Sequence, residues 1–385
     1  MSELSYLEKL LDGVEVEWKT LEDISIKISS GGTPKTGVSE FYDGDIPWLR
    51  TQEVNFCDIW DTEVKITESG VKNSSAKWIP KNCVIVAMYG ATVGKIGINK
   101  IPMTTNQACA NIQLNEEVAH YRYVFHFLCS QYTYIKSLGT GSQTNINAQI
   151  VKNIKIPIPC PDNPEKSLAI QSEIVRILDK FTALTAELTA ELTAELNMRK
   201  KQYNYYRDQL LTFKEGEVEW KALGEIGEFI RGKRFTKADY VEDGGISVIH
   251  YGEIYTRYGV YTTHSLSQVR ADMAASLRYA KHGDVVITDV GETVEDVGKA
   301  VAWLGDDDIA IHDHCYAFRH SLNPKFISYY MQTDSFISEK AKYVARTKVN
   351  TLLINGFSKI MIPVPYPKDH EKSLKEQARI VEILD

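Results

Sequence analysis

The sequence lacks the features of membrane, secreted and zinc-ribbon proteins. It contains no run of about 18 apolar residues, so no transmembrane helix is predicted. The first residues have neither the basic region nor the apolar region of a secretory signal. The six cysteines are scattered without a Cys-x-x-Cys pair, which argues against a zinc ribbon or a disulfide framework. We therefore expect a cytoplasmic protein with no membrane partner.

Net positive charge is also missing. The chain has 44 Lys and Arg against 51 Asp and Glu, a net charge of −7, which argues against a nucleic-acid binder that is basic throughout. However, residues 1–64 hold 5 basic and 14 acidic side chains, whereas residues 65–155 hold 10 basic and 3 acidic ones. The acidic average therefore hides a basic sub-surface. A length of 385 residues predicts two or three domains.

Motifs for catalysis are incomplete. Residues 90–95 resemble a phosphate-binding loop, but the loop is one residue short and lacks Ser or Thr after its Lys. Residues 291–299 have the wrong spacing, and we interpret both segments as turns between strands. Residues 312–315 read His-Asp-His-Cys, yet no second ligand cluster is evident, and alternate residues of a strand face opposite sides. A structural role is favoured there, so we expect no catalytic residue and no metal site.

The most informative positive feature is an internal repeat. Residues 15–21 (Glu-Val-Glu-Trp-Lys-Thr-Leu) return as residues 217–223 with one change. Residues 157–179, with their Pro-rich start and a Glu-Lys-Ser-Leu segment, return as residues 363–385 with several changes. The two matches occur in the same order, at offsets of 202 and 206 residues. These offsets are much longer than the repeat of a solenoid protein. They predict two copies of a unit made of a domain and a helix.

Between these matches the two halves diverge but keep the same order of expected elements. A short β-branched run, residues 84–87 or 285–288, leads into a Gly-rich loop. An aromatic, helix-like stretch follows, residues 118–131 or 324–342, and the second stretch opens with an Asn323 cap before Pro. The ends of the two halves are similar and the sequences between them differ. This pattern predicts one scaffold that presents two different specificities.

Residues 164–213 are predicted to form a long helix. Pro164 begins the segment, no further Pro and no Gly occur in it, and the sequence Lys-Glu-Gly that follows residue 213 ends it. Unbroken, it would be roughly 75 Å long. Residues 185–196 are three Thr-Ala-Glu-Leu repeats, whose leucines drift around the helix by about 40° per repeat. Two interpretations stay open: a coiled-coil arm, or a ruler in which each repeat adds about 6 Å. The leucines of these repeats, together with the one just before the first repeat, form a stripe along the helix, which consists of Leu184, Leu188, Leu192 and Leu196.

Basic and polar loops supply the candidate DNA-binding residues. Lys and Arg contact phosphates or guanine, whereas Asn and Gln pair with adenine edges. A single basic cluster is more often a solvated face, but recurrence in both halves favours DNA binding. The candidates in the first half are Tyr89, Thr92, Lys95, Ser142, Gln143, Asn145 and Asn147, and those in the second are Arg231, Lys233, Arg234, Arg346, Lys348 and Asn350.

Six short motifs carry a resemblance to a known family. They are Gly31-Gly32-Thr33-Pro34, Asp45-Ile46-Pro47-Trp48, Ser74-Ser75-Ala76-Lys77-Trp78-Ile79-Pro80, Thr105-Asn106-Gln107-Ala108-Cys109, Gly141-Ser142-Gln143 and Lys155-Ile156-Pro157-Ile158-Pro159. With two variable domains alternating with two similar helical regions, the chain resembles the DNA-specificity subunits of type I restriction–modification enzymes. The Thr-Ala-Glu-Leu repeat is typical of the C subgroup. The resemblance covers nearly the whole chain and is weakest over residues 224–360.

The resemblance implies an α+β fold. Two globular target-recognition domains with twisted mixed or antiparallel sheets, residues 1–155 and 216–362, are separated by long coiled-coil helices. Residues 156–215 form the central helical spacer, and residues 363–385 begin a distal helical region. Two alternatives stay open for that region: the sequence is truncated, or the protein ends there and borrows a helix from another copy.

The resemblance also implies a non-catalytic role in DNA recognition. Each domain reads one half of a bipartite, asymmetric site on double-stranded DNA, and the repeat number sets the unread spacer. Two methyltransferase subunits dock on the helices, and motor–nuclease subunits complete the enzyme. S-adenosylmethionine, ATP and Mg²⁺ belong to these partners, so this chain needs no cofactor. The alternatives are a stand-alone endonuclease or methyltransferase and a coiled-coil adaptor without DNA contact.

Overall fold

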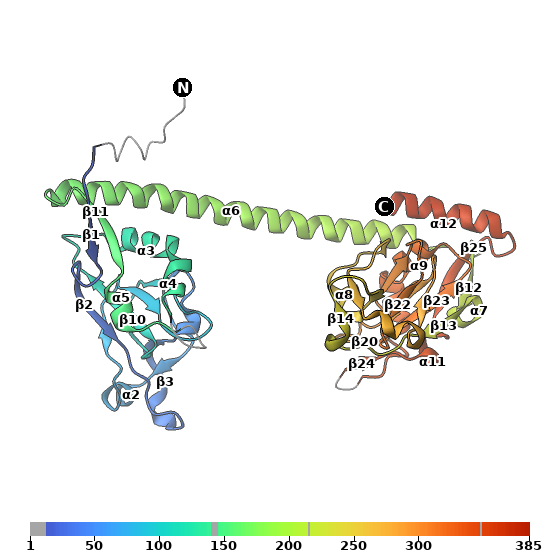
Figure 1. Cartoon of the computed structure of the whole chain (residues 1–385), viewed down its shortest axis with the longest axis horizontal. Coiled ribbons are helices and arrows are strands. Elements are labelled where there is room, and N and C mark those ends of the chain that lie inside the picture. Colours follow the sequence, from blue (N-terminus) through green and yellow to red (C-terminus); the bar gives the residue numbers. More distant parts are fainter. Residues whose placement is uncertain (1–12, 140–144, 215, 347–348) are drawn as a thin grey trace. The chain divides into compact units, whose positions relative to one another are not determined.

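The computed structural model describes residues 13–139, 145–214, 216–346 and 349–385. The chain divides into two compact units, one up to Glu191 and the other from Leu192 (Figure 1). Among the described residues, no helix combines the length and the apolar character that a bilayer crossing requires. Each unit contains β-sheets, short helices and part of one long helix.

In its described residues, the first unit contains one sheet of five strands, one of four and one of two. Their orders are β2-β10-β7-β8-β4, β5-β3-β9-β6 and β1-β11. The strands are β1 (Val16–Thr20), β2 (Ser25–Ser30), β3 (Tyr42–Leu49), β4 (Cys57–Ile59), β5 (Lys65–Ile66), β6 (Trp78–Ile79), β7 (Val84–Ala87), β8 (Ile96–Asn99), β9 (Met103–Thr105), β10 (Cys109–Leu114) and β11 (Lys155–Pro159). The helices are α2 (Glu68–Lys72), α3 (Tyr121–Ser130), α4 (Tyr132–Ser137) and α5 (Ala148–Lys152), with 3-10 turns η1 (Ser39–Phe41) and η2 (Thr51–Glu53).

The described part of the second unit has two sheets of five strands and two of two strands. Their orders are β13-β23-β19-β21-β16, β14-β17-β15-β22-β18, β12-β25 and β20-β24. The strands are β12 (Val218–Ala222), β13 (Gly227–Arg231), β14 (Tyr240–Val241), β15 (Ile246–Ile249), β16 (Tyr261–Thr262), β17 (Ser267–Val269), β18 (Tyr279–Ala280), β19 (Val285–Thr288), β20 (Val290–Gly291), β21 (Ala300–Trp303), β22 (Ile309–Ile311), β23 (Cys315–His320), β24 (Asn350–Thr351) and β25 (Met361–Pro365). The helices are α7 (Leu223–Ile226), α8 (Tyr251–Thr256), α9 (Pro324–Tyr330), α10 (Asp334–Lys340), α11 (Ile354–Phe357) and α12 (His370–Leu384), with 3-10 turns η3 (Lys237–Asp239) and η4 (Ala271–Ser276).

The two units share one topology. In each, the main sheet has three antiparallel pairings followed by one parallel pairing, which joins β4 to β8 in the first unit and β16 to β21 in the second. The second sheet is again matched, because β3 pairs parallel with β9 as β15 does with β22. The repeated Trp18 and Trp220 lie opposite Pro157 and Pro363 in the same register. The expected common scaffold is therefore confirmed, including the divergent interior.

The central strand of each main sheet is buried on both faces. Val84 and Val86 of β7 pack with the residues of α3 and α5, whereas Ile85 and Ala87 pack with the second sheet. Such a strand has no solvent face, so its sequence is apolar throughout rather than alternating. The same holds for β19, whose four residues are all buried. The predicted β-branched runs are thus the cores of the two domains.

The long helix α6 runs from Pro164 to Leu210, three residues short of the predicted end, and is about 70 Å long at 1.5 Å per residue. Its start packs on the first unit through Ile170 and Val175, and Leu211, just after its end, joins the core of the second unit. The four leucines of the predicted stripe are each more than half exposed: Leu184, Leu188, Leu192 and Leu196.

Two expectations about elements need correction. The stretch 324–342 is not one helix, because α9 ends at Tyr330 and Thr333 caps a new helix by accepting from the Phe336 amide. The stretch 118–131 is helical only from Tyr121. The predicted Asn323 cap is confirmed, since its side chain accepts from two amides of α9. Strands β11 and β25 cross the predicted domain boundaries after residues 155 and 362.

Candidate nucleic-acid interface

The turn after β7 carries three of the predicted residues. The Gly94 amide donates to the Ala87 carbonyl at 2.8 Å, and the Ala87 amide donates to the Lys95 carbonyl at 2.9 Å. These bonds close a turn between β7 and β8, which confirms that this glycine-rich segment connects strands. Gly94 has a φ of +80°, a conformation that favours glycine over other residues.

The side chains of this turn form a polar rim beside exposed aromatic rings. The Lys95 amine donates to Asn55 Oδ1 at 2.9 Å and lies 5.9 Å from the centre of the Phe56 ring. The Thr92 hydroxyl donates to the Thr51 carbonyl at 2.7 Å, whereas Tyr89 is 38% exposed. Since an ammonium group has three donors, Lys95 retains protons for a phosphate or a base.

The segment that follows residue 144 lies against the same turn. The Ile146 amide donates to the Met88 carbonyl at 3.0 Å, and Asn145 beside it is half-buried. Asn147 caps α5, because its Oδ1 accepts from the Ile150 amide at 2.9 Å. In the structure its carboxamide oxygen is therefore engaged by the protein rather than open to a base. The predicted Ser142 and Gln143 lie outside the described residues.

In the second unit, Arg231 ends strand β13 and is held by three groups. Its Nη2 lies 3.2 Å from Asp289 Oδ2, its Nε donates to the Asp313 carbonyl at 3.1 Å, and its guanidinium lies 5.7 Å from the centre of the Tyr316 ring. The side chain is nevertheless 52% exposed. Arg231 is therefore a half-exposed cation in a fixed position.

The remaining predicted residues of the second unit differ in solvent exposure and in whether the protein already binds their side chains. Lys233 and Arg234 directly follow Gly232 and are exposed, as is Arg346. Asn350 lies in β24, where its side-chain amide donates to the Glu292 carbonyl at 2.8 Å and supports the loop after β20. Its amide is thus partly engaged by the protein. Lys348 lies outside the described residues.

Backbone hydrogen bonds show that these residues occupy equivalent edges in both units. The Met88 amide donates to the Ala108 carbonyl, as the Asp289 amide donates to the His314 carbonyl. The Ile146 amide donates to the Met88 carbonyl, as the Leu352 amide donates to the Asp289 carbonyl. Three segments therefore meet at one edge of each unit. They are the turn after the central strand (β7 or β19), the loop before β10 or β23, and the segment before α5 or α11. This edge is the candidate nucleic-acid interface.

A cavity of about 740 Å³ at the second edge includes residues that the sequence did not single out for binding. Its lining includes Tyr251, Tyr255 and His314. His314 Nδ1 lies 3.0 Å from Asp289 Oδ1, whereas His312 is buried and burial lowers its pKa to about 4. Only the second histidine of the His-Asp-His-Cys segment thus reaches the cavity. Within the described ranges, no group of three or more His, Cys, Asp or Glu residues could hold a metal ion.

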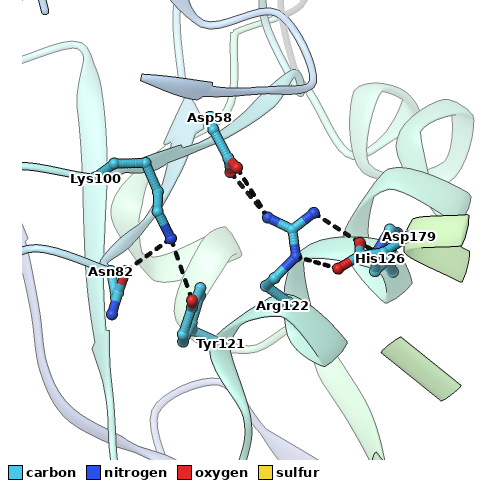
Figure 2. A network of polar contacts seen from close by, with 7 residues as sticks. All are labelled: Asp58, Asn82, Lys100, Tyr121, Arg122, His126 and Asp179. Atoms are coloured by element: carbon cyan, nitrogen blue, oxygen red, sulfur yellow. Dashed lines mark hydrogen bonds and ion pairs between the residues drawn. The ribbon is translucent and has the colours of Figure 1, made fainter. Parts of the chain in front are cut away.

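A network of charged residues fixes the start of α6 to the first unit (Figure 2). Arg122 of α3 donates to Asp179 of α6 at 2.6 and 2.8 Å and to Asp58 of β4 at 3.0 Å. His126, one turn further along α3, lies 2.7 Å from the same Asp179 carboxylate. In Figure 2 the guanidinium lies between the two carboxylates, with Lys100 donating separately to Asn82 and Tyr121. We call this network the first joint.

The second unit contains the same joint, although its residues have changed. Asp385, which directly follows α12, accepts from the Lys325 amine at 2.6 Å and from the Tyr329 hydroxyl at 2.9 Å, in the places of Arg122 and His126. Gln377 Oε1 accepts a hydrogen bond from the backbone amide of Asn323. In the same way, Gln171 Oε1 in the first unit accepts from the backbone amide of His120. The repeated sequence after each Pro-rich strand therefore encodes the attachment of a helix to the sheet-containing part of each unit.

Comparison with known proteins identifies the family. The family model described as "Type I restriction modification DNA specificity domain" matches residues 13–198 and 215–385. The EcoR124I/EcoR124II specificity subunit of Escherichia coli is 36% identical over 392 residues, covering 100% of this chain and 90% of the relative. The EcoprrI specificity subunit of Escherichia coli is 47% identical over 251 residues, covering 63% of this chain and 62% of the relative, which is less than two thirds of its length.

A solved structure supports the fold as well. A chain from a study of complex assembly and conformational transition in a type I R-M system aligns with a TM-score of 0.64 at 18% identity, covering 96% of this chain and 90% of that chain. This likeness bears out the expected fold, with mixed sheets in two domains and a long helix between them. The two segments matched by the family model and the full-length relative show that the chain belongs to the type I restriction–modification DNA specificity family.

Proposed function

We propose that this chain is the DNA-specificity subunit of a type I restriction–modification enzyme and has no catalytic activity of its own. The observation that carries the proposal is the duplicated frame, which presents two different polar edges. The full-length relative of the same family is named a specificity subunit, which supports the assignment. Each edge reads one half of a bipartite, asymmetric site on double-stranded DNA.

The chemistry of the two edges supports reading of different base pairs. The first edge presents Tyr89 and Lys95 beside aromatic rings, and the second presents Arg231, Lys233 and Arg234. Lys and Arg neutralise phosphates, and Arg is the commonest side chain to read guanine in the major groove. Because the frame is common to both units, the different side chains set the different half-sites.

The partners are those that the resemblance to type I specificity subunits implies, namely two methyltransferase subunits and motor–nuclease subunits. A net charge of −7 fits a free subunit that binds phosphates weakly, with the methyltransferase subunits supplying much of that contact. These subunits dock on the helices and carry S-adenosylmethionine, while motor–nuclease subunits carry ATP and Mg²⁺. The complex works in the cytoplasm. A salt titration that showed tight, sequence-specific binding by the isolated chain would contradict this division of roles.

The repeat in α6 acts as the ruler of the C subgroup. Each Thr-Ala-Glu-Leu unit lengthens the helix by about 6 Å, on the order of one to two base-pair steps, and turns it by about 40°. The stripe leucines are exposed on the part of α6 between the residues that pack on the two units. We therefore propose that the number of units sets the length of the unread spacer.

Deletion of residues 189–192 tests both the function and the ruler. The subunit is expressed with its methyltransferase in a host, and methylated adenines are mapped by sequencing. The wild type gives one bipartite motif, and the deletion shortens its spacer while both half-sites stay the same. The matched control, Thr189→Ala with Glu191→Ala, keeps the helix length and the spacer. Altered half-site bases or an unaltered spacer in the deletion would refute the ruler.

A second experiment tests the absence of catalytic activity. The purified chain is incubated with DNA, Mg²⁺ and S-adenosylmethionine without any other subunit. We expect neither cleavage nor methyl transfer, whereas the complex with methyltransferase subunits transfers methyl groups. Turnover by the isolated chain would favour the stand-alone enzyme.

A further inference from the structure

The central strand of the second unit is followed by a buried carboxylate that has no counterpart in the first unit. Asp289 is 1% exposed and directly follows β19. Its two oxygens accept contacts from two half-exposed side chains, Arg231 at 3.2 Å and His314 at 3.0 Å. We call these three residues the Asp289 triad.

The sheet topology that the two units share does not need the polar side chains of the Asp289 triad. The backbone bonds that align the units place Met88 where the second unit has Asp289, and Ala108 where it has His314. Both first-unit residues are buried and neutral, and the first unit builds the same sheet with them. Transfer of a carboxylate out of water is unfavourable, and a buried ion pair often gives no net stability over apolar residues. The triad therefore has a role other than folding.

The position of the triad indicates that role. His314 lines the cavity with Tyr251 and Tyr255, and Arg231 stands at the end of β13 with half of its side chain in solvent. Burial raises the pKa of the Asp289 carboxyl, and the hydrogen bond from His314 and the charge of Arg231 act in the opposite direction. The two partners thus share one carboxylate and present their remaining polar atoms at the edge.

We propose that Asp289 is a positioning residue that holds Arg231 and His314 to read a G·C base pair of the second half-site. This inference rests on the proposed function. In the neutral tautomer whose Nδ1–H donates to Asp289, the His314 ring keeps Nε2 as an acceptor, while Arg231 keeps unused N–H donors. In the major groove, a G·C pair shows two acceptors on guanine and one donor on cytosine, which is the complementary set. The first unit has neither the carboxylate nor its two partners.

The decisive variant is Asp289→Asn in the full chain, assembled with its methyltransferase subunits. Methylated adenines are mapped, and affinity is measured for duplexes that carry the mapped site or single base-pair changes in it. We expect discrimination at one G·C pair of the second half-site to fall by about 5- to 150-fold, with the first half-site unchanged.

The chain provides a matched control on the same strand. Asp284 directly precedes β19, is 3% exposed and pairs with Arg319 at 2.9 Å, at the other end of the sheet. Asp284→Asn removes a similar ion pair of a buried carboxylate, at the opposite end of β19 from Asp289, so it reports the effect of lost stability alone. It leaves both half-sites unchanged in the mapped motif.

Two further variants keep the test decisive if Asp289→Asn fails to fold. His314→Ala and Arg231→Lys change half-exposed side chains and keep the buried carboxylate, and each is expected to relax the same base pair. An unchanged second half-site in these variants would overturn the inference while the wild-type motif still supports the proposed function. If the wild-type complex gives no bipartite motif, the proposed function itself fails.

Discussion

The first joint allows a quantitative test of how α6 is attached to its domain. Asp179 accepts two hydrogen bonds from Arg122 and contacts His126, and its side chain is 34% exposed. Asp179→Asn removes the charge and turns one acceptor into a donor that faces the guanidinium. Arg122 keeps Asp58 as a partner, so it is not left unpaired.

The expected magnitude follows from these contacts. Hydrogen bonds to charged groups contribute about 1.5–3 kcal/mol when buried, and the exposed third of the Asp179 side chain reduces that value. We therefore expect a loss of about 1–2 kcal/mol in the free energy of local opening, which corresponds to roughly 5- to 30-fold faster exchange of the protected amides. The affected amides are those of α3 and of the first turns of α6.

Hydrogen exchange with peptide-level readout measures this effect. Lys325→Met in the second joint is the mirror experiment, since it removes one of the two partners of Asp385 and should loosen α9 and α12 only. Unchanged exchange in α3, or equal acceleration in both units after Asp179→Asn, would refute the assignment of this network as a local joint.

Three further predictions concern stability. Partial burial raises the pKa of Asp179, but the hydrogen bonds from α3 outweigh it and lower the pKa, so the stabilisation by the joint is complete above about pH 3.9. The difference between wild type and Asp179→Asn should shrink as pH falls below that value and vanish below the lowered pKa of the folded state. Burial lowers the pKa of Lys340 to about 8, so the second unit should gain stability between pH 8 and about 10.4, and urea unfolding of Lys340→Met should lack that gain. A Cβ on Gly31 would lie 1.9 Å from the Thr105 carbonyl oxygen, so Gly31→Ala should lower the free energy of unfolding by about 3 kcal/mol or more, whereas Gly259→Ala, with open space around it, should change it by less than about 1 kcal/mol.

The parts of the fold that the sequence predicted are those with a local or repeated signal. The β-branched runs before each glycine-rich turn became β7 and β19, and the absence of Gly and Pro predicted α6. The sequence does not reveal the break within residues 324–342, because an aromatic stretch remains compatible with a helix on both sides of Thr333. There, the hydroxyl cap competes locally with continuation of the helix.

The candidate residues were harder to predict, since a polar side chain in a loop has several uses. The ability of Asn to pair with adenine favours Asn147 and Asn350 as DNA contacts, but in the structure the first caps a helix and the second supports a loop. Asn147 precedes a short apolar helix, so the capping pattern was present in the sequence. For Asn350 the partner is the distant Glu292 carbonyl, which no local pattern reveals.

The alignment of the two edges could not be found from the sequence for a physical reason. The turn after β19 is three residues longer than the turn after β7, and both are closed by the same backbone hydrogen bonds. Because those bonds involve only amides and carbonyls, the side chain at the first position of the turn is free to be Met88 in one copy and Asp289 in the other. Sequence similarity is lost where the specificities differ, while the frame stays the same. The positions that determine specificity are therefore best found by matching hydrogen bonds between the two units, and the buried charge at Asp289 is the clearest difference that this comparison gives.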